Sequence, residues 1–374
     1  MDHKQTWTLF VTGAAALMLG TTAAAAPSPG TLLVLEKGTL TLALIDPHSL
    51  KVVARVPSGP DPHEVIASSD GRCAYISNYG GDGGDLHTIS VVDLQARAPL
   101  QPIDLGALRS PHGLDFADGR LYFTAETSKA IGRYDPATQR IDWVMGTGQD
   151  RTHMVQVAQD PAHLVTSNVT SGSISFLDET IRQAAPPPPG APGNPPVAAN
   201  APARNPPVVP PPRRSWTLTT VAAGRGAEGF DISPDGRQVW AANAQDGTVT
   251  VIDVATKKAV QTFPIPVAGA NRLKFTPNGK VVLLSGLGRF GAAATTSEPT
   301  ANLIAVDVVT HAITRRFDLG GGSAGILMDP DGTRAYVAVT QGNRIAVVDL
   351  ATLQVTGEIA PLAQPDGIAW AGGP

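Results

Sequence analysis

The stretch VTVIDVATKKAVQT, residues 249–262, decides the fold of this chain. An apolar, alternating run ends at Asp253, a turn follows, and a second alternating run begins at Ala259, which predicts strand, turn, strand. The same phrase, a small apolar run closed by an aspartate, occurs seven times, ending at Asp46, Asp93, Asp135, Asp178, Asp253, Asp307 and Asp349. A strand-turn-strand unit that recurs along a chain indicates a repeat architecture.

The spacing of these aspartates measures the repeat. Successive intervals are 47, 42, 43, 75, 54 and 42 residues. The two long intervals each contain an insertion of low complexity: residues 184–214, with 13 prolines and no aromatic, and residues 288–300. Without the insertions these intervals become 44 and 41 residues. A period of about 40–45 residues with four short strands is typical of a β-propeller blade.

The two ends of the chain fit together as parts of one blade. The chain begins at Thr31 with only the last three strands of a blade, and residues 365–370 form an isolated first strand. That strand would complete the first blade and leave no exposed sheet edge. We therefore predict an all-β fold: a seven-bladed β-propeller of four-stranded antiparallel blades, closed by the C-terminal strand.

Composition limits the function classes. Charged residues make up 16% of the chain and the net charge is -4, so there is no basic surface for nucleic acid. The single cysteine, Cys73, cannot form an internal disulfide, and a c-type haem would need two cysteines. Nothing in the charge or the closed ring requires an oligomer, and we expect a monomer.

The first residues resemble a secretory signal peptide. Lys4 precedes an apolar run, residues 7–19, and small residues follow at positions 23–26. The apolar run is shorter than the roughly 20 residues that span a bilayer. We therefore expect residues 1–26 to be removed, residues 27–374 to form a single domain without a membrane span, and the protein to be periplasmic or secreted.

Aligning the repeats with one another exposes two rings of residues at the channel mouth. One ring lies at the start of the first strand of each blade, and the other at the end of the second strand. The first ring is Asp366, His63, His112, His153, Glu228, Asn271 and Ala324. The second ring is Glu36, Asn78, Glu126, Asn168, Asn243, Gly286 and Val339. Both rings are polar in the first five blades and mostly apolar in the last two, and such variation within a repeat marks a binding surface.

Three consecutive histidines beside a glutamate suggest metal chemistry. Neutral imidazole and carboxylate are ligands of zinc and similar ions, so His63, His112, His153 and Glu228 are the candidate ligands of a divalent metal. The same residues would equally line a polar pocket without chemistry, or bond to loops of the next blade. The residues leave open whether the protein is an enzyme, and no other cofactor is suggested.

The two insertions lie in connections between strands. Residues 288–300 leave the loop between the second and third strands of the sixth blade, on the face of the two rings, where they could cover the channel or remain a surface loop. Residues 184–214 interrupt the last hairpin of the fourth blade, and their composition predicts an extended, polyproline-like excursion.

Several phrases resemble the YVTN-type propeller repeat of secreted bacterial proteins. They are Tyr75-Ile-Ser-Asn78 after Pro62-His63 and Asp70-Gly71, then Thr88 to Asp93, with looser copies at residues 239–243 and 335–339. The resemblance covers residues 31–370 and implies a seven-bladed propeller. Relatives of this kind include lactonases, metal-dependent lyases, the haem domain of a nitrite reductase and binding proteins. The expected function is binding of a small polar ligand or a partner segment at the channel mouth. The alternative is a metal-assisted, lactonase-like hydrolase or lyase.

Overall fold

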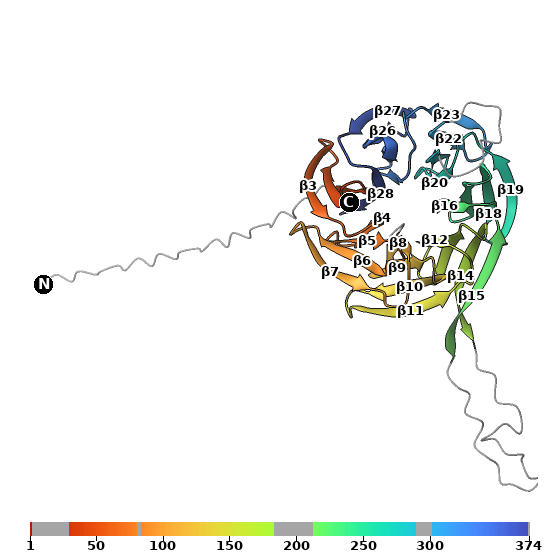
Figure 1. Cartoon of the computed structure of the whole chain (residues 1–374), viewed down its shortest axis with the longest axis horizontal. Coiled ribbons are helices and arrows are strands. Elements are labelled where there is room, and N and C mark those ends of the chain that lie inside the picture. Colours follow the sequence, from red (N-terminus) through yellow and green to blue (C-terminus); the bar gives the residue numbers. More distant parts are fainter. Residues whose placement is uncertain (2–29, 81–83, 183–211, 289–300, 373–374) are drawn as a thin grey trace, which may run out of the picture.

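The computed structural model describes residues 1, 30–80, 84–182, 212–288 and 301–372. In these residues the chain forms seven four-stranded antiparallel sheets arranged as a ring (Figure 1), which confirms the predicted propeller. The expected signal peptide and nearly all of the two insertions lie outside the described residues. Within the described part, no helix has the length and apolar character of a membrane span.

Each blade runs from an inner strand beside the channel to an outer strand at the rim. Blade 1 consists of β28 (Pro365–Ala371), β1 (Thr31–Glu36), β2 (Thr41–Asp46) and β3 (Lys51–Pro57). Blade 2 consists of β4 (Pro62–Ala67), β5 (Cys73–Asn78), β6 (Thr88–Asp93) and β7 (Ala98–Asp104). Blade 3 consists of β8 (Pro111–Ala117), β9 (Arg120–Ala125), β10 (Ala130–Asp135) and β11 (Arg140–Gly146).

The remaining four blades follow in chain order. Blade 4 consists of β12 (Thr152–Val157), β13 (His163–Asn168), β14 (Ser173–Arg182) and β15 (Arg213–Ala222). Blade 5 consists of β16 (Ala227–Ile232), β17 (Gln238–Asn243), β18 (Thr248–Asp253) and β19 (Lys258–Pro264). Blade 6 consists of β20 (Ala270–Phe275), β21 (Val281–Gly286), β22 (Leu303–Asp307) and β23 (Ile313–Phe317). Blade 7 consists of β24 (Ile326–Met328), β25 (Arg334–Val339), β26 (Arg344–Asp349) and β27 (Gln354–Ile359), with a 3-10 turn at Thr340–Gly342.

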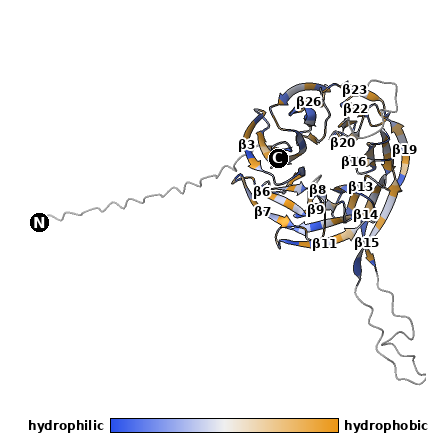
Figure 2. Ribbon diagram, viewed as in Figure 1, coloured by the Kyte–Doolittle hydropathy of each residue, from blue (hydrophilic) through white to orange (hydrophobic). Residues whose placement is uncertain are grey.

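The core is divided among the blades. The described residues form seven buried apolar clusters, one between each pair of neighbouring blades. The two middle strands of a blade are therefore buried on both faces, which is why they read as nearly continuous apolar runs. The outer strands mix exposed and half-buried positions, and both hydrophobic and hydrophilic segments appear around the rim (Figure 2).

Ring closure is made by backbone hydrogen bonding between the two ends of the chain. β28 pairs antiparallel with β1, with Thr31 opposite Ala371 and Val34 opposite Ile368. This confirms the predicted closure. β1 thus has a partner on both sides, and blade 1 has four strands like the other blades.

The repeated aspartate ends the third strand in six blades. In blade 5 the Asp253 carboxylate accepts hydrogen bonds from the backbone N–H and the hydroxyl of Thr256 and closes the turn. Asp178 is the exception, because β14 continues to Arg182 and pairs with β15 from Arg213. Asp178 instead binds Lys257 of blade 5 and His163. The hairpin of blade 4 is therefore longer than the sequence suggested, and Arg213 and Arg214, which were predicted to end the insertion, belong to β15.

Candidate metal centre at the channel mouth

The first predicted ring is formed by the second residue of the inner strands. His63, His112, His153, Glu228, Asn271 and Asp366 all occupy this position. In each of these strands the pairing register shifts by one residue here, so a β-bulge turns the side chain away from the regular alternation. In blade 7 the corresponding residue, Ala324, is buried and precedes the short strand β24.

Neighbouring members of this ring touch in an unbroken arc. The His63 and His112 ring centroids are 5.1 Å apart, and those of His112 and His153 are 3.8 Å apart. The arc continues from His153 Nε2 to Glu228 Oε1 at 3.7 Å. At its other end Lys37 Nζ lies 2.9 Å from His63 Nε2 and 3.3 Å from Asp366. Asn271 is buried beside the arc, and its Oδ1 has no partner among the described residues.

The second predicted ring divides into two kinds of residue. Asn78, Asn168 and Asn243 turn inward on their own blade, each donating from Nδ2 to Thr or Ser hydroxyls of the adjoining strand. Glu36 binds Arg55, the Thr41 hydroxyl and the Ala363 backbone N–H. These four side chains hold turns together and do not join the histidine arc.

Glu126 does join the histidine arc, because it stands one position further along than the sequence alignment placed it. Asn78 pairs with Pro62 across the strands, and the residue that pairs with Pro111 in blade 3 is Ala125. Glu126 is therefore the counterpart of Tyr79, one residue beyond the strand. The hairpin of blade 3 is one residue shorter, which shifted the alignment. The position that faces the channel is thus filled by Lys37, Tyr79 and Glu126 in blades 1, 2 and 3.

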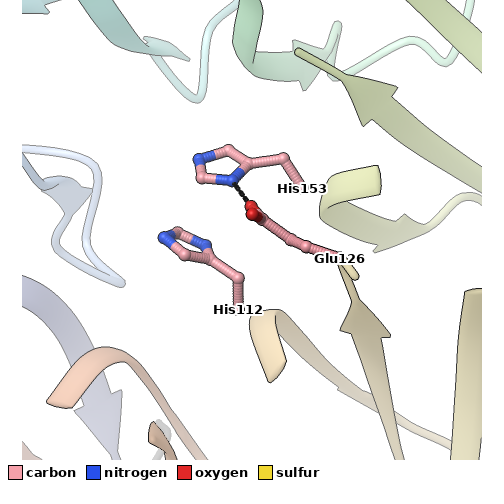
Figure 3. Close-up of side chains that lie close together, drawn as sticks. All are labelled: His112, Glu126 and His153. Atoms are coloured by element: carbon pink, nitrogen blue, oxygen red, sulfur yellow. Dashed lines mark hydrogen bonds and ion pairs between the residues drawn. The ribbon is translucent and has the colours of Figure 1, made fainter. Parts of the chain in front are cut away.

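His112, Glu126 and His153 form a group able to hold a metal ion. Each offers one ligand atom, these atoms all lie within 4.8 Å of one another, and all three residues are buried (Figure 3). His153 Nδ1 donates to a Glu126 oxygen, while His112 Nδ1 and His153 Nε2 have no hydrogen-bond partner in the described structure. Buried nitrogens without partners are costly unless something else binds there. The geometry brings Glu126 into the predicted ligand set, with His63 and Glu228 on either side.

The electrostatics give His112 and Glu126 the protonation states that metal ligands need, whereas His153 would have to lose a proton to bind an ion. Burial, together with the neighbouring His153 and His63, holds the pKa of His112 well below its usual value, so this imidazole is neutral. Burial also opposes charge on His153, but Glu126 and Glu228 outweigh it and raise the pKa of His153. Burial alone would raise the pKa of Glu126, yet His153 and Arg151 lower it, so Glu126 is a carboxylate.

A second layer of residues fixes Glu126. The Tyr79 hydroxyl donates to Glu126 Oε2 at 2.6 Å, and Arg151 Nε lies 3.3 Å from the same oxygen. The Tyr79 ring also lies against His63 and His112, with centroid distances of 4.8 and 5.3 Å. Sequence analysis missed Tyr79 and Arg151. Tyr79 could have been found by aligning the residue after the second strand. Arg151 could have been found by aligning the residue before the inner strand, where Asp61 and Ser110 stand in blades 2 and 3.

A buried ion pair crosses the ring below this layer. Glu64 on β4 and Arg272 on β20 belong to blades 2 and 6, yet their side chains pair directly. We call this pair the crossbar. Arg272 NH1 also lies 3.7 Å from Glu228 Oε1, so the crossbar adjoins the metal-binding group. Each of the two residues directly follows a first-ring residue in sequence. The sequence did not predict either of them, since most blades have glycine at this position.

Glycine is required at those counterparts by the close approach of the inner strands. A Cβ on Gly113 would lie 2.5 Å from the His153 carbonyl oxygen, and a Cβ on Gly367 would lie 2.6 Å from that of His63. The strands that carry the histidines thus pack directly against glycine in the preceding blade. This contact sets the spacing of the histidine arc.

Comparisons with known proteins support the fold alone. Neither the protein-family models nor the curated proteins give a match. Among solved structures, a functionally unknown protein from Desulfotomaculum acetoxidans DSM 771 is similar with a TM-score of 0.66 and 10% identity, covering 92% of this chain and 99% of that one. Dihydro-heme d1 dehydrogenase in complex with DHE is similar with a TM-score of 0.57 and 15% identity, covering 93% of this chain and 77% of that one.

Proposed function

We propose that this propeller binds a divalent metal ion through His112, Glu126 and His153 and holds a small polar ligand against it at the channel mouth. The observation that carries the proposal is the convergence of three buried ligand atoms within 4.8 Å. Two imidazoles and one carboxylate form the donor set of many three-ligand zinc sites, which keep a further position for water or substrate. The two unpartnered imidazole nitrogens are consistent with such an ion.

The charge balance of the mouth also favours a cation. The ionised side chains in contact around the arc comprise three bases and five carboxylates: Lys37, Arg151 and Arg272, then Asp61, Glu64, Glu126, Glu228 and Asp366. The raised pKa of His153 favours its protonated form, which leaves one excess negative charge, and release of that proton to a bound ion leaves two. A divalent ion would restore neutrality, and in a half-buried site such compensation is strongly favoured.

The residues of the mouth would divide the work. A bound divalent ion polarises a ligand oxygen or lowers the pKa of a bound water. Tyr79 and Arg151 hold the Glu126 carboxylate in one orientation. His63 lies at the edge of the group with Lys37 beside it, where it could exchange a proton with a bound molecule.

Metal analysis of the protein purified without chelator tests the proposal. We expect about one divalent ion per chain, lost in His112→Ala. His87→Ala is the matched control, because His87 is an exposed histidine that pairs with Asp104 away from the channel. A protein that stays metal-free after incubation with zinc, manganese and nickel, and that shows no binding heat with any of them, would contradict the metal site.

A second candidate is metal-assisted hydrolysis or lyase chemistry. It is favoured by the His63 and Tyr79 side chains, two groups with exchangeable protons whose rings lie against each other and against His112. The resemblance to YVTN-type, lactonase-like propellers points the same way. Turnover of a lactone panel by the metal-loaded protein, abolished in His63→Gln while the metal is retained, would support it. Metal binding without turnover of any lactone or ester would leave binding as the function.

We also propose that the protein is exported. The support is the basic start, the apolar run at residues 7–19 and the small residues at positions 23–26. Sequencing the N-terminus of protein recovered from the periplasm or medium of a bacterial host should give a start near residue 26. Recovery of uncleaved chain in the cytosol alone would contradict export.

A further inference from the structure

A third ring of residues lies deeper in the channel, on the other side of the crossbar. In six blades it is the fifth residue of the inner strand. In blade 7, whose inner strand is shorter, the equivalent residue is Leu327, because it pairs with Tyr336 as Ile66 pairs with Tyr75 in blade 2. Going round from blade 1 the ring is Ala369, Ile66, Asp115, Gln156, Asp231, Lys274 and Leu327. Blades 3 to 6 thus contribute four consecutive polar side chains, and blades 7, 1 and 2 contribute apolar ones. Variation of this kind at one repeat position marks a binding surface rather than a structural one.

This ring lines a cavity of about 630 Å³. Glu64 and Arg272, the crossbar, lie at one end of the cavity, and the hairpin residues Pro234 to Gly236 lie at the other. The cavity therefore opens toward the face opposite the metal centre. Its volume is within the range of about 300–1,000 Å³ that small-molecule sites occupy.

The polar side of the cavity has more acceptors than donors. Asp231 Oδ1 accepts from Gln156 Nε2 and from Lys274 Nζ, each at 2.9 Å. Asp115 accepts from the Val157 and Phe116 backbone N–H groups and has no cation within ion-pair distance among the described residues. Gln156 Oε1 is buried and has no hydrogen-bond partner there. One ammonium thus faces two carboxylates and an unused amide oxygen, so the cavity lacks a donor and a positive charge.

The opposite side of the cavity is apolar. Leu327, Ile368 and Trp370 line it and are each only half-buried, although they pack against the core cluster between blades 7 and 1. Their free faces point at space rather than at protein. An apolar body placed there would remove this surface from water, which is favourable by about 25 cal/mol per Å².

We propose that this cavity, which we call the lower channel, is a second ligand site for a small amphipathic amine. The protonated amino head would donate to Gln156 Oε1 and lie between Asp115 and Asp231, and the apolar body would cover Leu327 and Trp370. An anionic head is disfavoured, because Lys274 is already paired with Asp231. The crossbar lies between this site and the proposed metal centre, and none of His112, Glu126 and His153 lines the lower channel.

Isothermal titration of the full chain with three probes that share a phenyl ring and a two-carbon linker tests the proposal. The probes are 2-phenylethylamine, 2-phenylethanol and 3-phenylpropanoate. We expect the amine to bind at least tenfold more tightly than the alcohol, and the carboxylate not to bind. Gln156→Leu keeps the side-chain volume and removes both the free acceptor and the donor to Asp231, which keeps its bond from Lys274. It should weaken amine binding about tenfold, or about 1.4 kcal/mol. His112→Ala, on the other side of the crossbar, should leave it unchanged.

Asp115→Asn provides an independent variant if Gln156→Leu perturbs folding. Its amide oxygen can still accept from the Val157 N–H, so the fold should be kept, as a thermal melt would verify, while the negative charge is lost. Amine affinity should again fall about tenfold. Equal affinity for amine and alcohol, tighter binding of the carboxylate, or amine binding that is lost in His112→Ala but kept in both lower-channel variants would each overturn the proposal.

Discussion

Glu126 is the residue on which the proposed metal centre depends most, because it is the carboxylate of the three-residue group and is bonded directly to His153. It is also held by Tyr79 and Arg151 and is almost fully buried. Replacing it by glutamine keeps its size and one acceptor oxygen but removes the charge. The ion would then lose the one anionic ligand of the group formed by His112, Glu126 and His153.

We predict that Glu126→Gln lowers zinc affinity at least 100-fold, measured by competition with a chromogenic chelator, since altering even an outer-shell partner costs 10- to 100-fold. Glu179→Gln is the control, because Glu179 pairs with Arg214 on the long hairpin of blade 4. Equal loss in both variants would indicate general destabilisation and not a ligand role.

Tyr79 is predicted to act through Glu126 and not on the ion itself. Tyr79→Phe retains the ring contacts with His63 and His112 and removes only the hydroxyl that donates to Glu126. We expect zinc affinity to fall about tenfold with unchanged stoichiometry. A complete loss of metal from Tyr79→Phe would mean that the hydroxyl is itself a ligand.

Some residues of the candidate site could be predicted from the sequence and others could not. Self-alignment of the repeats predicted His63, His112, His153 and Glu228 as neighbours, because strand position alone fixes them. It misplaced Glu126 by one residue, since a hairpin shortened by one residue cannot be located from spacing when the strand residues themselves vary. The crossbar was out of reach, because a contact between blades 2 and 6 has no signature within any single repeat.

Among the elements, the second and third strands of a blade are joined by an asparagine clamp. In blade 5 the buried Asn243 donates to Thr248 and Thr250 and accepts from the Gly224 N–H. Blade 3 lacks the clamp as a whole: Ala125 stands in place of the asparagine, and Ala130 and Gly132 stand in place of the hydroxyl residues. Loss of both partners together leaves nothing unpaired, which is why that blade tolerates it.

We predict that Asn243→Ala lowers the free energy of unfolding by about 2–3 kcal/mol, because it leaves buried partners unsatisfied. The double variant Asn243→Ala with Thr250→Val should be less destabilised than the sum of the two single changes. Urea denaturation followed by tryptophan fluorescence measures both. Strict additivity would contradict a direct interaction.

The strand-ending aspartates make stability depend on pH. Hydrogen bonds from Thr352 hold the pKa of Asp349 below its usual value, and those from Thr256 do the same for Asp253. A folded-state pKa below the unfolded one means that stability is fully present above the unfolded pKa and is lost as the pH falls through the folded one. We expect the contribution of these aspartates to stability to be constant from pH 7 to 5 and to be lost below about pH 4. Asp349→Asn should show a smaller drop in the urea midpoint than the wild type. An identical pH dependence would contradict the contribution of this turn.

Strands could be predicted from the sequence where the turn that follows is stabilised by side chains close to it in sequence. The aspartate phrase gave all seven third strands, since the capping carboxylate is local. It failed at Asp178, where the hairpin continues for four residues on each side, because tertiary pairing with Lys257 replaces the turn. The Asp-Gly hairpins likewise predicted the inner strands but could not indicate the β-bulges that direct the histidines.

In the whole molecule, a single strand, β28, closes the ring by pairing with β1. Removing residues 365–374 would strip β1 of its inner partner and expose the apolar faces of Leu33 and Tyr336. We predict that this truncation gives protein that aggregates or elutes as large oligomers in size-exclusion chromatography, because an unpaired inner edge recruits other chains. Removal of residues 373–374 alone should leave a monomer, and a monomeric, cooperatively melting protein without residue 365 onward would contradict the role of β28.

The closing strand β28 is also connected to the histidine arc through side-chain contacts. Asp366 on β28 reaches Lys37, which follows β1, and Lys37 in turn contacts His63. These three residues come from the last, the first and the second blade-forming segments of the chain, so their contact can form only after the two termini have met. Pairing of β28 with β1 would therefore be linked thermodynamically to the proposed site: a molecule bound against His63 would favour this pairing, and fraying of β28 would lower the affinity for that molecule. Binding at the proposed channel-mouth site would then depend on whether β28 is paired with β1.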